Sequence, residues 1–212
     1  MTTLPDFDEL NNIRTTLADI VTGEEELTDD VPSRRPIDRK RIEDTIFALI
    51  TMGYVYGIEV AGLDLETDIP ASGERMFSVA NTPTKGETFR DRINTHIDQY
   101  EATADNDPNA AQTLIERLSV VAETETHRTI NTGSLDGAEE YAEGHPDATI
   151  YKTWETMMDD RVRDTHDYLE GMTIPLDARF YTYDGDSAMY PGDFMLAENN
   201  VNCRCIIRYT KA

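Results

Sequence analysis

Two cysteines near the carboxyl end of the chain are the residues best suited to chemistry. Cys203 and Cys205 are the only cysteines among 212 residues, and one position separates them. In a strand, side chains two positions apart point to the same face with Cα atoms about 6.6 Å apart, so both thiols would face one side. A disulfide between them is not expected, because an i, i+2 bridge strains its geometry and a cytoplasmic protein meets reducing conditions.

His166 is the third residue of this group. It lies in the segment 159–170, which we expect to be a helix on which His166 shares the core-facing side with Leu169. If the final strand packs against this helix, two thiolates and one imidazole supply three ligands of a tetrahedral Zn²⁺ site. The fourth ligand would come from His127, from His145 or from an aspartate.

Two alternatives to a metal site remain open, since C-x-C is less common than C-x-x-C and the chain has no second pair. In the first, the cysteines are small apolar core residues beside a hydrogen-bonded histidine. In the second, Cys203 is a nucleophile, His166 its base and Asp160 the group that orients the base. Catalysis is not expected, because the chain lacks a nucleophile elbow, a glycine-rich phosphate loop and an H-E-x-x-H motif.

Arginines near this group are expected to form a structural network. Guanidinium groups suit buried, bidentate pairing with carboxylates. Arg161, Arg163 and Arg204 would therefore pair with acidic residues such as Asp160 or Glu125. Such pairs would set the internal register of the domain.

The elements that position these residues follow a change of pattern along the chain. Alternating β-forming residues at 149–154, 178–183 and 202–210 predict a short sheet packed on the helix 159–170. Tyr190, Pro191, Gly192 and Asp193 form a turn sequence, in which proline sets φ and glycine permits left-handed geometry. This turn would return the chain to the last strand.

Helical spacing of apolar residues dominates the earlier part of the chain. It predicts helices that run from Asp6, from Ile37 toward Gly62, over 89–100, and from Pro108 to an end at Gly133. The segment 24–36 is expected to be a linker and 63–86 an irregular connection that offers an interaction surface. The predicted fold is α+β: a helical region at 1–119, suited to docking, followed by a small mixed domain at 120–212.

The chain is strongly acidic, with 42 Asp and Glu against 19 Lys and Arg and a net charge of −23. An acidic surface stays hydrated where salt screens its self-repulsion, because the Debye length falls to about 3 Å near molar salt. We therefore expect adaptation to a salt-rich, halophilic environment, with an acidic protein from an ordinary host as the alternative. Affinity for nucleic acid comes largely from cations, so DNA is at most a secondary partner.

No membrane partner is expected. The apolar stretch 42–65 is broken by Glu43, Asp44, Glu59 and three glycines, and no run approaches the roughly 20 residues that a span needs. The first eight residues lack the basic and apolar regions of a secretory signal. We expect a soluble protein made in the cytoplasm.

The order of these features resembles a known family. The residues that carry the resemblance are, along the chain, Trp154, Asp159-Asp160-Arg161-Val162-Arg163-Asp164-Thr165-His166, Gly171, Phe180, Tyr190-Pro191-Gly192-Asp193 and Asn202-Cys203-Arg204-Cys205. This order resembles the C-terminal domain of phage head morphogenesis proteins, the Mu F-like minor head protein family, over about 122–209. The upstream segment 123–128 resembles the acidic helix end that precedes this domain, although Glu123 stands where family members more often carry arginine.

The resemblance implies a minor head protein of a tailed virus, acting in head morphogenesis. It implies a place in the virion, inside the head near the portal vertex, after synthesis in the host cytoplasm. The implied partners are portal protein, major capsid protein and, in packaging or ejection, the viral DNA. Two alternatives are a zinc-stapled module that contacts DNA and a delivered enzyme of ADP-ribosyl transfer or hydrolytic type. Because the chain ends seven residues after Cys205 and its helices lack a catalytic signature, we expect no enzyme.

Overall fold

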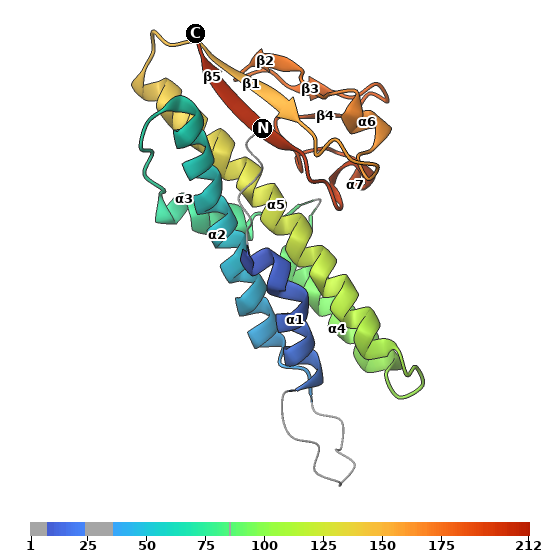
Figure 1. The fold of residues 1–212 in the computed structure, drawn as a ribbon. Coiled ribbons are helices and arrows are strands. Elements are labelled where there is room, and N and C mark those ends of the chain that lie inside the picture. Colours follow the sequence, from blue (N-terminus) through green and yellow to red (C-terminus); the bar gives the residue numbers. More distant parts are fainter. Residues whose placement is uncertain (1–7, 24–35, 85) are drawn as a thin grey trace.

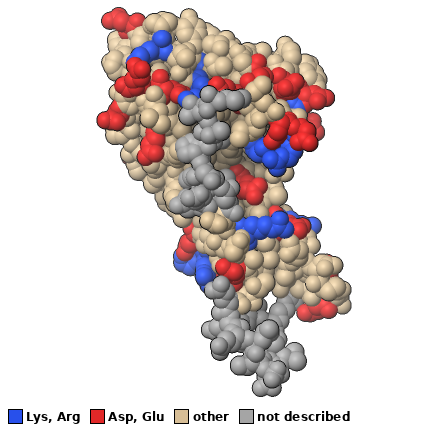
Figure 2. Space-filling view, in the orientation of Figure 1, with Lys and Arg blue, Asp and Glu red and all other residues tan. Residues whose placement is uncertain are grey.

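A computed structural model describes residues 8–23, 36–84 and 86–212 of the chain. The fold is α+β, as predicted from the sequence. Figure 1 shows long helices lying side by side, with the strands gathered against one end of this helical bundle. Figure 2 shows carboxylates spread over the visible face, whereas lysines and arginines form a few small groups beside them.

Four predicted helices are present. They are α1 (Asp8–Thr22), α2 (Arg39–Leu65), α4 (Phe89–Thr103) and α5 (Ala110–Gly144). Their apolar faces form one core, in which Leu17, Ile46 and Ile93 are fully buried. The predicted linker 24–36 lies, except for Pro36, outside the described residues.

The prediction of an irregular connection over 63–86 was wrong in part. The segment contains a short helix, α3 (Gly73–Asn81), whose amino end is capped by the Ser72 side chain. The helix is only nine residues long and buries one residue fully, Ala80, so it offers little more than two turns in which a periodic pattern could be recognised. Arg75 holds α3 on α5 through an ion pair of 3.1 Å with Asp136.

The predicted end of a helix at Gly133 was also wrong, because α5 continues through it to Gly144. Gly133 serves close packing instead: a Cβ atom there would lie 2.1 Å from the Tyr54 carbonyl oxygen of α2. A Cβ atom at Gly57 would lie 2.0 Å from the Ile130 carbonyl oxygen of α5. The two longest helices therefore cross at glycines, so their backbones can approach directly.

The division of the chain at 119 and 120 stays a prediction. It falls within α5, which is continuous across that point. The first half of α5 contributes Leu118 to the core of the bundle, and its second half contributes Ala138 to the core below the sheet. A single helix thus connects the two apolar clusters.

α2 is long and apolar enough to cross a membrane, judged by length and composition alone. In this fold, 56% of its most apolar 18-residue window is buried inside the structure. The expectation that its charges and glycines interrupt it too often for a span was therefore too strict. A central core helix has the same composition, because it buries apolar residues around most of its circumference.

The sheet is small and antiparallel, in the order β2-β1-β5. Its strands are β1 (Ile150–Glu155), β2 (Thr173–Pro175) and β5 (Ile206–Lys211). Trp154 of β1 lies opposite Ile207, and Lys152 lies opposite Tyr209. A separate hairpin pairs β3 (Phe180–Tyr181) with β4 (Ser187–Ala188). The predicted strands at 178–183 and 202–210 are thus shorter than expected.

The predicted helix 159–170 is mostly absent. Its helical part is α6 (Asp164–Asp167), and a second short helix, α7 (Ala197–Asn200), lies further along the chain. The Asp159 side chain accepts a hydrogen bond of 3.1 Å from the backbone N–H of Arg161, which stabilises a turn instead of a helix. Arg163 is extended, with φ −73° and ψ 148°, so α6 begins only after it.

Candidate metal centre

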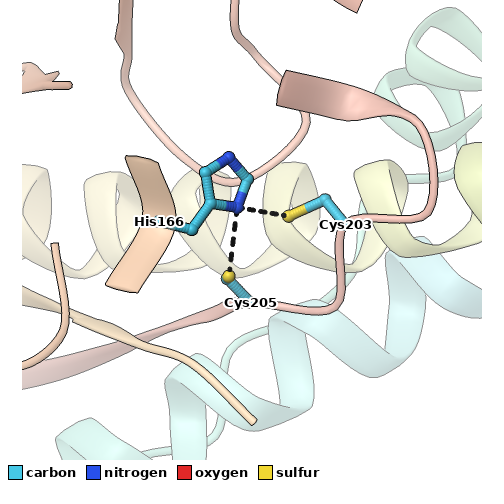
Figure 3. A group of neighbouring side chains, drawn as sticks. All are labelled: His166, Cys203 and Cys205. Carbon is cyan, nitrogen blue, oxygen red and sulfur yellow. Dashed lines mark hydrogen bonds between the residues drawn. The ribbon is translucent and has the colours of Figure 1, made fainter. Parts of the chain in front are cut away.

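The two thiols and the imidazole converge, as the sequence suggested. His166 Nδ1 lies 3.5 Å from Cys203 Sγ and 3.4 Å from Cys205 Sγ, and all three side chains are buried. Figure 3 shows the imidazole edge facing both sulfur atoms. The three potential ligand atoms lie within 4.8 Å of one another, so this group could hold a metal ion.

The cysteines do not reach this position from a strand. β5 begins at Ile206, so both thiols come from the loop that precedes it. In that loop Asn202 has a left-handed φ of 56°, and the Cys203 N–H donates to the Asn200 carbonyl at 3.1 Å. A turn, not strand alternation, therefore places the thiols on one side.

Aromatic side chains enclose the imidazole. His166 stacks on Phe194 with ring centroids 5.2 Å apart, and Trp154 meets it edge-on at 5.5 Å. Phe180 packs against Trp154 at 5.2 Å. Within the described chain, His166 Nε2 is buried without a hydrogen-bond partner. The imidazole is therefore positioned mainly by packing, with Nδ1 aimed at the sulfurs.

His127 and His145 do not join this group. His127 Nε2 lies 2.8 Å from the Cys205 carbonyl oxygen, and Asn131 Nδ2 donates to the same oxygen at 3.2 Å. Because these two residues are one turn apart on α5, they hold the backbone of the cysteine loop together. His145 is exposed and stacks on Tyr141 with centroids 4.1 Å apart.

The two thiols differ in acidity. A hydrogen bond from Cys205 lowers the pKa of the Cys203 thiol, and the His166 imidazole acts in the same direction against the effect of burial. Donating that bond, together with burial, raises the pKa of Cys205. The first proton therefore leaves Cys203, and a thiolate beside an imidazole is a form that binds metal ions.

The arginine network uses a different carboxylate from those predicted. Arg204 Nη2 lies 2.6 Å from Asp159 Oδ1, and Arg161 Nη2 lies 3.6 Å from Asp159 Oδ2. The hydrogen bond from Arg204 lowers the pKa of Asp159 to about 2. Asp160, the predicted partner, is exposed. Arg163 donates to the Val201 carbonyl, so it fixes the loop before the cysteines.

Glu125 is buried and pairs with two other arginines, of which Arg128 is buried and Arg92 is partly exposed. It lies 2.5 Å from Arg92 and 3.0 Å from Arg128. Residues 190–193 form a turn against this point, where Gly192 has φ 99° and a Cβ atom would lie 3.1 Å from the Arg128 side chain. Asp193 closes the turn by accepting from the Met189 N–H at 2.8 Å.

Two buried polar residues of this region carried no signal in the sequence. The Asp186 carboxylate accepts hydrogen bonds from the N–H groups of Met195 and Leu196 and from the Asn199 amide, each at 3.0 Å. Burial acts to raise the pKa of Asp186, but these bonds outweigh it and lower that pKa. Lys152 is fully buried in β1, and burial lowers its pKa to about 8.

Comparisons with known proteins place this geometry in context. A family model described as Phage Mu protein F like protein matches residues 79–208, which include α4, α5, β1 to β4 and the first half of β5. The minor head protein GP7 of Bacillus phage SPP1 is 29% identical over 110 residues, or 52% of this chain and 35% of that protein.

A second relative is the NAD(+)--arginine ADP-ribosyltransferase EFV of Enterococcus faecalis (strain ATCC 700802 / V583). It is 38% identical over 85 residues, or 40% of this chain and 17% of that protein. The chain therefore spans much less than two thirds of the length of either relative. No solved structure matches the chain.

Proposed function

Because the chain belongs to the Phage Mu protein F like family, we propose that it acts at the portal vertex of a tailed virus as a minor head protein. The family match covers more than half of the chain and includes every residue of the thiol–imidazole group. Together with the similarity to minor head protein GP7, this supports a structural part of a phage head, located in the virion.

In this proposal the helical region, residues 1–119, docks on portal protein or on major capsid protein. Exposed apolar side chains support docking: Leu63 is 76% exposed and Phe77 is 60% exposed, on α2 and α3. The module at 120–212 then positions the protein inside the head, where it aids genome packaging or ejection. The role is non-enzymatic, because the similarity to the transferase covers 17% of that enzyme.

Co-purification tests the assignment. Tagged protein is expressed with the portal protein or the major capsid protein of the same virus, and complexes are isolated by size-exclusion chromatography. A stable complex with either is expected. Mature particles, purified and analysed by mass spectrometry, are expected to contain the chain. Its absence from particles, or failure to bind both proteins, would overturn the proposal.

The proposal also assigns Zn²⁺ to Cys203, Cys205 and His166. In a tetrahedral site with the usual zinc–sulfur and zinc–nitrogen lengths, sulfur and nitrogen lie about 3.5 Å apart. The two separations here, 3.5 and 3.4 Å, fit that value. A cavity of about 10 Å³ beside Cys205 and Asn202 has room for roughly one water as the fourth ligand. The ion would fasten α6 to the loop before β5.

Elemental analysis of the purified protein tests the metal. We expect about one zinc per chain, since the two thiolates and the imidazole bind as a set. Cys203→Ser and His166→Gln are expected to lose zinc, whereas exposed His145→Gln retains it. Substoichiometric zinc in protein with intact thiols would remove the assignment and favour the alternative of two apolar cysteines beside a packed histidine.

A DNA-contacting module is the weaker alternative. The net charge of −23 leaves few cations to displace counterions from phosphates. Duplex DNA binding that falls steeply with salt would favour this alternative. Negligible binding at low salt would exclude it.

A further inference from the structure

A cleft of about 440 Å³ lies between α4 and α5, outside the thiol–imidazole group. Its apolar floor is formed by Val120 and Val121 of α5 and by Val201, which follows α7. Val120 is 36% exposed and Val201 is 38% exposed, so the floor presents apolar surface that no described residue covers. The loop of Val201 is held on α5 by a hydrogen bond of 3.4 Å from the Asn202 N–H to Thr124. We call this hollow the α4/α5 cleft.

The rim of the cleft carries spare positive charge, which is unusual in a chain of net charge −23. Glu125 is shared by two arginines, Arg92 at 2.5 Å and Arg128 at 3.0 Å, so a single buried carboxylate pairs with two positive charges. Glu116 is balanced by Arg14 at 3.2 Å.

Arg117 adds a further positive charge to the rim. Its guanidinium donates to the amide oxygen of Gln99. Among the described residues, no carboxylate forms an ion pair with it. A carboxylate that enters the α4/α5 cleft would therefore meet an available guanidinium.

The His96 imidazole provides a second polar group of the cleft, with one ring nitrogen available for a hydrogen bond. It lines the cleft, and its Nδ1 is buried without a hydrogen-bond partner in the described chain. Burial lowers the pKa of His96, which favours the neutral imidazole. A buried ring nitrogen without a partner costs free energy, which a hydrogen-bonding group of a bound segment would recover.

The shape of the cleft favours a polypeptide over a compact small molecule. A second hollow of about 380 Å³ continues along the seam of the two helices and shares His96, Thr113 and Arg117 with the first. Its lining, which includes Gln99 and Thr103, is more polar. An elongated groove with one apolar end accommodates an anchor side chain and the backbone beside it.

We propose that the α4/α5 cleft binds a segment of a partner protein that inserts one apolar side chain beside a carboxylate. The apolar side chain lies on Val120, Val121 and Val201, and the carboxylate pairs with Arg117. This inference goes beyond the portal-vertex proposal, because it specifies a recognition chemistry that is tested without any head protein. It is also independent of zinc, since the α4/α5 cleft contains none of the three metal-ligand candidates.

The test uses the full chain and three synthetic tetrapeptides. The probe is acetyl-Asp-Leu-Phe-Asp-amide; one control replaces both aspartates by asparagine, and the other replaces Leu and Phe by serine. Binding is followed by NMR of the valine methyl groups. Saturable shifts at Val120, Val121 and Val201 are expected with the probe. Affinity is expected to be about fivefold lower for the asparagine peptide and unmeasurable for the serine peptide.

Matched variants locate the interaction. Arg117→Gln is expected to lower the affinity for the probe about fivefold. It should leave the affinity for the asparagine peptide unchanged, because that peptide has no carboxylate to pair with Arg117. Lys40→Gln removes a charge from an 81% exposed lysine side chain outside the cleft and is expected to leave the affinity for the probe unchanged. Val120→Ser removes part of the apolar floor and is expected to weaken both leucine-containing peptides.

Three results would overturn the proposal. The first is the absence of saturable shifts at the three valines. The second is equal affinity for the aspartate and asparagine peptides, which would show that the cleft recognises apolar side chains without a carboxylate. The third is binding of N-acetyl-leucine as tight as that of the tetrapeptide, which would assign the cleft to a small carboxylate.

Discussion

The His127 imidazole of α5 lies 2.8 Å from the carbonyl oxygen of Cys205. This contact connects the centre of the longest helix to the loop that presents both thiols. Asn131 donates to the same oxygen, so the cysteine loop is held by two side chains of one helical face. The position of the cysteine loop therefore depends on this face of α5.

Removing this support is expected to destabilise the fold. His127→Ala and Asn131→Ala should each lower the free energy of unfolding by about 1–3 kcal/mol, because each removes a buried hydrogen bond. The double variant should lose more than the sum, since only then is the carbonyl left without either donor. Urea unfolding measures these values, with the exposed His145→Ala as control. Additive losses would show that the two residues act independently.

Lys152 is expected to oppose stability at neutral pH. It is fully buried, donates to the Met189 carbonyl at 3.0 Å, and has a pKa lowered to about 8 by burial. Lys152→Met should raise the free energy of unfolding at pH 7 by about 2 kcal/mol, because the variant buries no charge. Lys40→Met, at a lysine whose side chain is 81% exposed, should change it little.

The sign of the pH dependence follows from the direction of the pKa shift. The folded pKa of Lys152, about 8, lies below the ordinary value of 10.5, so the folded state binds this proton less tightly. The penalty is complete below pH 8 and disappears as the pH rises toward 10.5. Urea unfolding of both proteins across this range should show the advantage of Lys152→Met shrinking. An advantage that is constant with pH would contradict the assignment to this ammonium.

Gly133→Ala is expected to separate α2 from α5. The added Cβ atom would lie 2.1 Å from the Tyr54 carbonyl oxygen, which is backbone and cannot rotate away. We expect a loss of more than about 3 kcal/mol in the free energy of unfolding. Gly144→Ala, where a Cβ atom meets nothing within 4 Å, is the matched control. Thermal unfolding followed by circular dichroism distinguishes the two, and equal losses would show that helix crossing is not the cause.

Adaptation to high salt remains a proposal that rests on the net charge of −23. Mutual repulsion among carboxylates weakens as the Debye length falls from about 10 Å at 0.1 M salt to about 3 Å at 1 M. The midpoint of thermal unfolding should therefore rise between 0.1 and about 1 M potassium chloride. A midpoint that does not change with salt would favour an acidic protein from an ordinary host.

The amino-acid sequence by itself determined the elements whose burial repeats at a regular interval. Leu17, Ile46 and Ile93 mark helices by their apolar spacing, and β1 buries alternate residues from Ile150 to Trp154. His166 and the two cysteines could also be grouped in advance, since few residue types bind metal and these lie in segments expected to pack together.

Only the tertiary structure decided which distant groups meet. In the sequence Gly133 is typical of a helix end, but in the structure it is the point where α2 packs directly on α5. His127 is a possible metal ligand by residue type, but its nitrogen contacts the Cys205 carbonyl oxygen. Likewise, the choice of Asp159 over Asp160 as the partner of Arg204 depends on a turn stabilised by a side chain. Local periodicity reveals which face of an element is buried, whereas the pairing of polar groups depends on distances that exist only after the elements have packed.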